Sequence, residues 1–440
     1  MKPALSIRLS HMLTLAPDAV TDPEIARHFR RNFLVTVMDM TTWNLGSAFI
    51  SPSTILPVFA THLTDSTIIL GLIPALLEFG LFLPPMFVAP YVERMPRKYP
   101  WVLLLGVVER IPYLLLPLLA LWLSGLSESM AVPALIGIVA WMAVGSGIVT
   151  TPWQEMVAKV IPVTHRGRLY GTGYFMGQLL SIGAASAAAA VLAAFPYPHN
   201  FVASFAIGTI GIVVSLLFLV FTVEPSRPVQ TSLSPTYGHY LRRVRQILRS
   251  RPNYRRYISS RWLIQLGRMP LGFMAIFAVQ RFQFPDSSAA IFTGILAASG
   301  MVGYAFWGTI GDRWGHKRVL ELATGVWLIA LLAALLVSIL GWEWGVYLAF
   351  ALMGLSNAGN LISSANLPLE FGPESERPTY IGLTRTAIGP VLLIAPLLGG
   401  GIIQVLSYPL FFAVSLAFTL GGLLLLVRGV KEPRYHPAQP

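Results

Sequence analysis

Long apolar stretches recur along the whole chain and dominate its pattern of hydrophobic and polar positions. An α-helix rises 1.5 Å per residue, so about 20 apolar residues cross the ~30 Å hydrocarbon core of a membrane. The pattern predicts twelve membrane-spanning helices, called spans 1 to 12 below, joined by short polar loops. They cover residues near 32–60, 67–91, 100–123, 131–156, 169–194, 201–222, 257–281, 287–310, 318–340, 344–367, 379–402 and 406–428.

The largest internal polar segment separates the first six spans from the last six. In this segment apolar residues from Tyr240 to Leu248 recur at helical spacing among arginines, which is typical of a basic amphipathic helix on a membrane surface. The chain therefore divides into an N-terminal leader at 1–31, a six-helix bundle at 32–222, a linker at 223–256, a second six-helix bundle at 257–428 and a tail at 429–440.

The placement of charge sets the expected topology. Only 11% of the 440 residues are charged, against about 25% in soluble domains, which excludes a soluble globular enzyme. The net charge of +12 alone is compatible with a nucleic-acid partner, but 26 of the 31 Lys and Arg lie in the N-terminal leader, the loops after even-numbered spans and the tail. Basic loops stay in the cytoplasm, so we expect both termini there, a lipid bilayer around the spans, and no nucleic acid.

Cofactor and enzyme chemistry finds no support in the sequence. There is no Cys, which excludes disulfides and thiolate metal sites, and the cytoplasmic segments contain no phosphate-binding glycine loop, metal-ligand cluster or Ser-His-Asp spacing. We expect no cofactor, no metal and no enzymatic activity, and a monomer. The charged leader differs from a cleaved signal peptide. Together with the missing Cys and glycosylation sequons, this fits a bacterial inner membrane.

Two short motifs occur once in each half, as in transporters built from structural repeats. Gly308–Arg318, GTIGDRWGHKR, follows span 8, and Ala89–Lys98, APYVERMPRK, follows span 2. His165–Gly171, HRGRLYG, opens span 5, and Glu376–Gly382, ERPTYIG, opens span 11. Two repeats at nearly equal offsets indicate an internal duplication.

On these motifs the chain resembles the major facilitator superfamily of secondary transporters. The copy after span 2 departs from the family pattern, with Glu93 for the usual Asp and Pro96 for a usual glycine. The resemblance implies an all-α membrane fold of two pseudo-symmetric six-helix bundles, a central cavity lined by spans 1, 4, 7 and 10, and alternating access. The charged motif residues would either latch the bundles at the cytoplasmic side or only set topology; they are Glu93, Arg94, Arg166, Asp312, Arg313, Lys317 and Arg377.

Two acidic residues inside spans are candidates for proton coupling. A charge at mid-membrane costs about 2.5–3.5 kcal/mol on insertion scales, so each needs a partner, water or a function. Asp39 shares a face of span 1 with Trp43, beside Asn44, and either meets substrate and protons or forms a structural ion pair. Glu78 lies in an apolar stretch of span 2, which disfavours the charged carboxylate. Its alternative role is a buried pair with Arg110.

Further polar residues are candidates for the substrate cavity or for helix packing. Span 7 carries a stripe of Arg261, Gln265 and Arg268; Arg268 is deep enough to bind an anionic group or to pair with Asp39, whereas Arg261 can reach the interface. In span 10, Asn357 and Asn360 would hydrogen-bond either substrate or a neighbouring helix.

Three other charged residues complete the candidates. Arg385 in span 11 would face Asp39 or Glu78 across the bundle interface. Glu109 and Arg110 are adjacent in span 3, which the resemblance places on the outside of the bundle, so we expect them to form a structural pair.

These features predict a secondary active transporter that moves a small solute by alternating access, coupled to protons or another ion. Arg268 suggests an anionic or zwitterionic solute. The alternatives are an uncoupled facilitator and, outside transport, a polytopic membrane sensor or an enzyme acting at the interface.

Overall fold

The computed structural model describes residues 23–82, 84–123, 125–226, 246–247, 249–371 and 377–433, and in these ranges the chain is helical with no strand. The first half contains α2 (Pro23–Ile50), α3 (Ile55–Thr61), α4 (Thr67–Phe82), α5 (Pro84–Glu93), α6 (Tyr99–Leu123), α7 (Glu128–Val160), α8 (Val163–Ala194) and α9 (His199–Leu219). The second half contains α11 (Pro252–Leu266), α12 (Pro270–Phe282), α13 (Ser287–Trp314), α14 (His316–Leu340), α15 (Trp344–Asn366), η1 (Leu367–Glu370), α16 (Arg377–Val405), α17 (Tyr408–Leu424) and η3 (Leu425–Gly429).

Every predicted span coincides with one helix or with two consecutive helices, which confirms the all-α membrane fold. Within the described residues, ten helices are long and apolar enough to cross a membrane. The two remaining spans are interrupted: α2 and α3 are separated at residues 51–54, and α4 is a shorter apolar helix followed by α5. Most of the predicted linker, including its amphipathic segment up to residue 245, lies outside the described residues, as does the leader up to residue 22.

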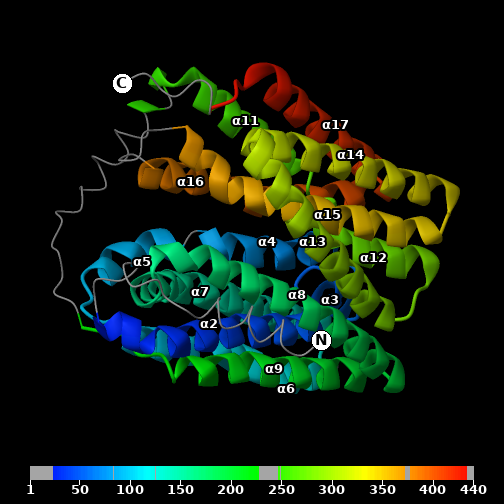
Figure 1. Ribbon diagram of the computed structural model, residues 1–440. Helices are drawn as coiled ribbons and strands as arrows, with labels where there is room; N and C mark the ends of the chain where they lie inside the picture. Colours follow the sequence, from blue (N-terminus) through cyan, green and yellow to red (C-terminus); the bar gives the residue numbers. More distant parts are fainter. Residues whose placement is uncertain are drawn as a thin grey trace, which may run out of the picture.

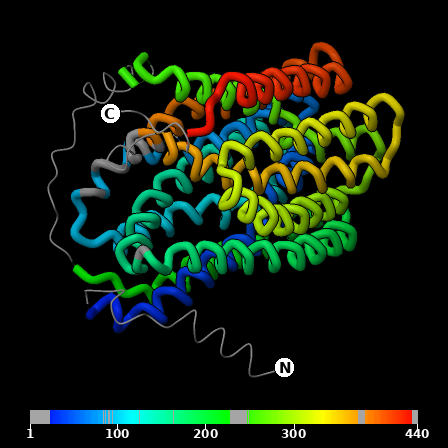
Figure 2. The backbone as a smooth tube through the Cα atoms, turned by 45° about the horizontal axis from the view of Figure 1, so that its top comes forward, coloured from blue at the N-terminus to red at the C-terminus, as the bar shows by residue number. Residues whose placement is uncertain are grey.

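The two halves of the chain pack along two long seams. Figure 1 shows the first half, blue to green, lying against the second half, green to red. One seam is formed by α4 with α16 and the other by α8 with α13. The short helix α3 also contacts α12. Figure 2, in which the top of this view comes forward, shows α8 running beside the yellow-green helix α13.

The loops gather at two opposite ends with different charge. At the end called the basic end below, the loops after spans 2, 4 and 6 meet, because Glu224 accepts hydrogen bonds from Lys159 Nζ at 2.8 Å and from the Lys98 amide at 2.7 Å. At the other end, called the acidic end, Thr64 after span 1 hydrogen-bonds Glu128 at the start of α7. The alternation of loops matches the charge pattern from which the topology was predicted.

A helix break and two helix prolines come together between the two halves of the chain. Span 7 is divided into α11 and α12 by residues 267–269, just before Pro270, and α4 and α16 contain Pro74 and Pro396. A proline removes a backbone hydrogen bond and bends a helix. The small cavity lined by Pro74, Met269 and Pro396 shows that these irregular points converge.

Glycine allows α4 and α7 to approach closely. A Cβ atom at Gly147 would collide with the carbonyl oxygen of Gly80 and would lie 3.0 Å from the Pro84 ring. A Cβ at Gly80 would in turn lie 2.5 Å from Ala143. The two helices therefore cross with backbone against backbone, which fixes one wall of the cavity described next.

Candidate functional site

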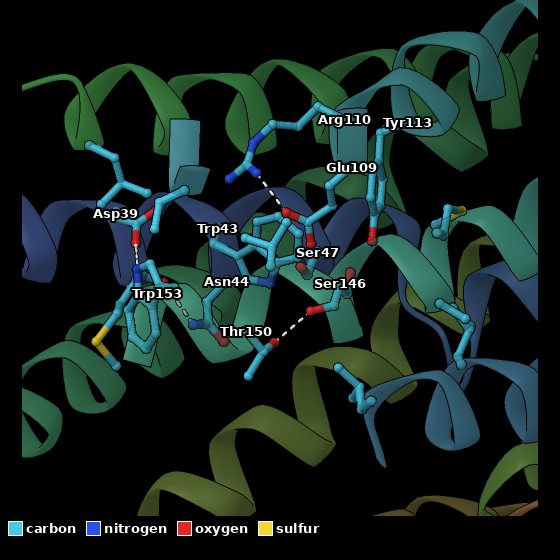
Figure 3. A pocket seen from close by; sticks show the side chains of 18 of the residues that line it. Asp39, Trp43, Asn44, Ser47, Glu109, Arg110, Tyr113, Ser146, Thr150 and Trp153 are labelled. Carbon is cyan, nitrogen blue, oxygen red and sulfur yellow. Dashed lines mark hydrogen bonds and ion pairs between the residues drawn. The ribbon is translucent and has the colours of Figure 1, made fainter. Parts of the chain in front are cut away.

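A cavity of about 440 Å³, called the main cavity below, lies within the first half of the chain. Its walls come from α2, α4, α6, α7, α8 and α9, and Figure 3 shows its polar side chains. This volume is in the range of pockets that hold small organic ligands. The lining residues include Asp39, Trp43, Asn44, Ser47, Glu109, Arg110, Tyr113, Ser146, Thr150, Trp153, Gln154 and Tyr174.

A buried ion pair forms part of the wall. Arg110 Nη1 donates to Glu109 Oε2 at 2.7 Å, and each residue is only 4% exposed (Figure 3). The predicted pairing of these neighbours is confirmed, but their expected position on the outside of the bundle is wrong. Both side chains line the cavity, because α6 turns this face toward α2 and α9.

Arg110 is held by hydrogen bonds within its own helix, α6, and to α9. Its Nε donates to the carbonyl oxygen of Ile212 at 3.2 Å, its Nη1 also to the Gly106 carbonyl at 3.1 Å, and its Nη2 to Ser215 Oγ at 2.9 Å. The guanidinium also lies over the Trp43 ring, 5.1 Å from its centroid, within the range of a cation–π contact. Each guanidinium nitrogen therefore has an acceptor inside the protein.

Asp39 lies at the same cavity without a directly bonded cation among the described residues. Its Oδ2 accepts a hydrogen bond from Trp153 Nε1 at 2.9 Å (Figure 3), and the residue is 6% exposed. Arg110 attracts it and Glu109 repels it through space. Asp39, Glu109 and Arg110 are thus one electrostatic group with two acids and one base.

A second cavity of about 210 Å³ lies between the halves. Asn44 and Ser47 line both this cavity and the larger one, and Asn357 from α15 lines its opposite wall. Asn357 also accepts a hydrogen bond from Arg268 Nη2 at 2.7 Å. Of the cavity residues predicted in spans 1 and 10, Asn44 and Asn357 therefore line this smaller, central space, whereas Trp43 and Asn360 do not.

Glu78 and Arg268 face each other across the seam between the halves. They line a cavity of only about 20 Å³, together with Gln265. The two charges attract each other without forming an ion pair within 4.0 Å, and the Arg268 guanidinium stacks 4.3 Å from the centroid of the Trp327 ring. The alternative pairings of Arg268 with Asp39 and of Glu78 with Arg110 are wrong, because α4 turns Glu78 toward α11.

The remaining candidates lie away from the main cavity. Arg261 donates to Asn360 Oδ1 at 2.7 Å and to Ser364 Oγ at 2.8 Å, so Asn360 bonds a neighbouring helix, the alternative that the sequence left open. Arg385 is exposed and lines none of the three cavities described here.

The described motif residues at the basic end are exposed or form bonds within their own half, rather than contacts between the two bundles. Asp312 and Arg313 are exposed, and Lys317 bonds Glu321 in its own helix at 2.5 Å. Arg166 donates to the carbonyl of Ile161 at 3.1 Å, and Arg94 is exposed. The side chains of Glu93 and Arg377 lie outside the described part of the structure. A latch between the bundles at this end stays a prediction.

Polar contacts join the two halves at the acidic end. Both carboxylate oxygens of Asp286, between α12 and α13, lie 3.1 Å from His62 Nε2, and Asn200 Nδ2 donates to Oδ2 at 3.1 Å. Nearby, Thr54 and Thr293 are hydrogen-bonded at 2.5 Å. His62 also stacks on Tyr197, with ring centroids 4.3 Å apart. This cluster links the two halves at the acidic end.

We expect Asp286→Asn to favour opening at the acidic end, because an amide cannot accept from His62 and Asn200 with the same charge assistance. The pair is partly exposed, so the separated population should rise only about threefold. Spin labels on Ser129→Cys and Trp342→Cys, two exposed positions in different halves, report the distance by pulsed electron resonance. The chain has no native Cys. Asp65→Asn is the control, and an unchanged distance distribution would contradict a closing role for Asp286.

Several residues of the main cavity were not predicted. Ser146, Thr150 and Trp153 occupy one face of α7 at spacings of four and three residues, and this stripe was a usable signal in the sequence. Tyr113 follows Glu109 by one turn on α6. His62 and Asp286 come from separate loops and Asn200 from the first turn of α9, and no local pattern connects them.

Comparison with known proteins agrees with this architecture. The family model for the Major Facilitator Superfamily matches residues 33–388 and, in a second match, 258–440. No curated protein matches the sequence significantly.

Solved transporters share the fold at low sequence identity. A D-xylose–proton symporter superposes with a TM-score of 0.73 at 12% identity, covering 92% of this chain and 99% of the symporter. A D323A mutant of the nucleoside transporter NupG gives 0.71 at 13% identity, covering 91% and 100%. The inward open conformation of the xylose transporter XylE from E. coli gives 0.67 at 11% identity, covering 91% and 96%. At these identities the likeness shows the fold alone. With the family match over most of its length and this fold, the chain belongs to the Major Facilitator Superfamily and is a multi-pass membrane transporter, not an enzyme.

Proposed function

We propose that this transporter moves a small solute by alternating access, driven by a proton gradient, with the solute held in the cavity of the first half. The observation that carries the proposal is Asp39, an acid buried on the wall of a small-molecule cavity and bonded there by Trp153. Burying a charged carboxylate is energetically unfavourable, and this penalty is relieved when the group takes up a proton or binds a positively charged or hydrogen-bonding ligand. Exchange between these two options couples a proton to the solute.

Glu78 is the second candidate for proton coupling. It lies at the seam between the halves, opposite Arg268 on the other half. A change in its charge alters the attraction between α4 and α11, and thereby the relative energy of the two orientations of the halves. Asp39 can therefore couple the proton to the solute, whereas Glu78 can couple it to the movement.

The basic end faces the cytoplasm in this proposal, by the positive-inside rule. Both termini are then cytoplasmic, the membrane is the bacterial inner membrane, and the transporter acts as a monomer. The bonds of Asp286 between the halves at the acidic end, which is the outer end in this proposal, support an inward-facing assignment.

Neutralising the two acids tests the proposal. In inverted membrane vesicles with an imposed pH gradient, pooled solutes are screened for uptake and release by wild type, Asp39→Asn and Glu78→Gln. We expect the wild type to accumulate its solute against a gradient. Asp39→Asn should abolish accumulation, because the coupling acid cannot titrate, while exchange of solute across the membrane persists.

Asp65→Asn, at an exposed acid outside the spans, is the matched control. If the flux ignores the pH gradient and both acid variants behave as wild type, proton coupling through these residues is wrong. The protein is then an uncoupled facilitator.

A further inference from the structure

We propose that the solute of the main cavity is an organic cation with an apolar or aromatic body, whose positive group binds beside Asp39. This inference rests on the proposed function only in taking the cavity as the solute site. It replaces the anionic or zwitterionic solute suggested by Arg268, because Arg268 does not line this cavity.

The charges on the cavity wall favour a cation. Within the described lining, two acids, Asp39 and Glu109, stand against one base, Arg110. Since Arg110 is paired with Glu109, Asp39 is left as the charge without a bonded counterion. A positive ligand group restores the balance, whereas a negative group adds to the excess.

Several hydrogen-bond donors of the wall are already in use. Besides Arg110, Trp153 Nε1 donates to Asp39, Asn44 Nδ2 to the Met40 carbonyl at 2.7 Å, and Thr150 to the Ser146 carbonyl at 2.6 Å. An anion beside Asp39 would meet a negative carboxylate, and the Trp153 donor there is already bonded to that carboxylate. A carboxylate offers about four acceptor positions. Asp39 interacts with the donors of Trp153 and Ser215, so it can still accept a hydrogen bond from a positive ligand group.

Aromatic rings surround the acid and suit the apolar body of such a ligand. Trp43, Tyr113, Trp153 and Tyr174 line the cavity, and Trp43 and Tyr113 are in edge contact with centroids 5.8 Å apart. The Trp43 ring already holds one cation, Arg110, at 5.1 Å. Aromatic faces attract ammonium groups, and a carboxylate beside them supplies the opposite charge.

Binding of matched probes to the purified full-length protein in nanodiscs of neutral lipid tests the charge preference. The probes are benzyltrimethylammonium, benzenesulfonate and 2-phenylethanol, which are of similar size and differ in charge, and binding is followed by titration calorimetry. We expect saturable binding of the cation, and at least about tenfold weaker binding of the other two, because a charge-assisted contact is lost.

Variants at one position separate charge from structure. Asp39→Asn should weaken cation binding by about tenfold or more, while Asp39→Glu, which retains the charge, should bind within a few-fold of wild type. Asp65→Asn is the control for an acid-to-amide change outside the cavity. Thermal unfolding of each variant shows that it is folded. Lower pH should weaken cation binding in wild type, because a proton competes for Asp39.

Three results overturn the substrate class: preference for the anion, equal binding of all three probes, or no saturable binding of the cation. Each leaves the proposed function standing if vesicles still show flux driven by the pH gradient. If that flux is absent but the cation still binds, proton coupling is wrong, whereas the preference of the cavity for organic cations stands.

Discussion

Replacing Arg110 with methionine should lower the free energy of unfolding by about 3–5 kcal/mol, the cost typical of breaking a buried ion pair on one side. The variant leaves Glu109 charged, 4% exposed and without its 2.7 Å partner. It also removes the donors that satisfy the Ile212 carbonyl and Ser215. The loss is measured by following unfolding in mixed micelles as the fraction of a denaturing detergent is raised.

A second substitution separates the uncompensated charge from lost packing. The double variant Glu109→Gln with Arg110→Met should recover a large part of the stability, because no buried charge remains. Arg168→Met, at an exposed arginine, should leave stability unchanged. If Arg110→Met unfolds like wild type, the ion pair contributes nothing to the fold and the cavity wall is held by other contacts.

Gly147→Leu should be the most damaging of the glycine substitutions on α7. Its side chain has to enter the space occupied by the Gly80 carbonyl and the Pro84 ring, and backbone atoms cannot move aside as a flexible side chain can. We expect a loss of about 3 kcal/mol or more, at the upper end of overpacking effects. The same micelle unfolding experiment detects it.

Gly137→Leu is the matched control on the same helix. A Cβ at Gly137 meets no heavy atom within 4 Å, so leucine there faces open space on the surface of the bundle. It should be neutral or stabilising, since leucine favours a helix more than glycine does. Equal losses from both variants would show that the close approach of α4 and α7 is not what limits substitution.

The sequence was sufficient to predict the helices and their order. Apolar runs of membrane length separated by polar loops mark spans directly, and each predicted range meets helices in the structure. The internal repeats and the basic loops added the division into halves and the alternation of loop ends. The breaks at residues 51–54 and 267–269 follow from the nearby Pro52 and Pro270.

The rotation of each helix was harder to predict. In a membrane the surface facing lipid is as apolar as the surface facing the core, so the hydrophobic pattern does not indicate which side of a helix points inward. Asp39, Trp43 and Asn44 line a cavity within the first half rather than the expected central one, and the pairings of Glu78 and Arg268 and the cavity position of Glu109 depend on that rotation. Contacts between distant helices decide these positions, and a single sequence does not record them.

The main cavity takes all its described walls from residues 39–219, before the second half begins. If the solute binds in this cavity, as we propose, ligand selection is confined to the first half of the chain. Altering a handful of wall residues in α2, α6 and α7 can change the cargo while the seams with α13 and α16 are left intact. A chimaera that keeps the first six spans and takes its last six from another transporter of this fold should retain the original ligand preference.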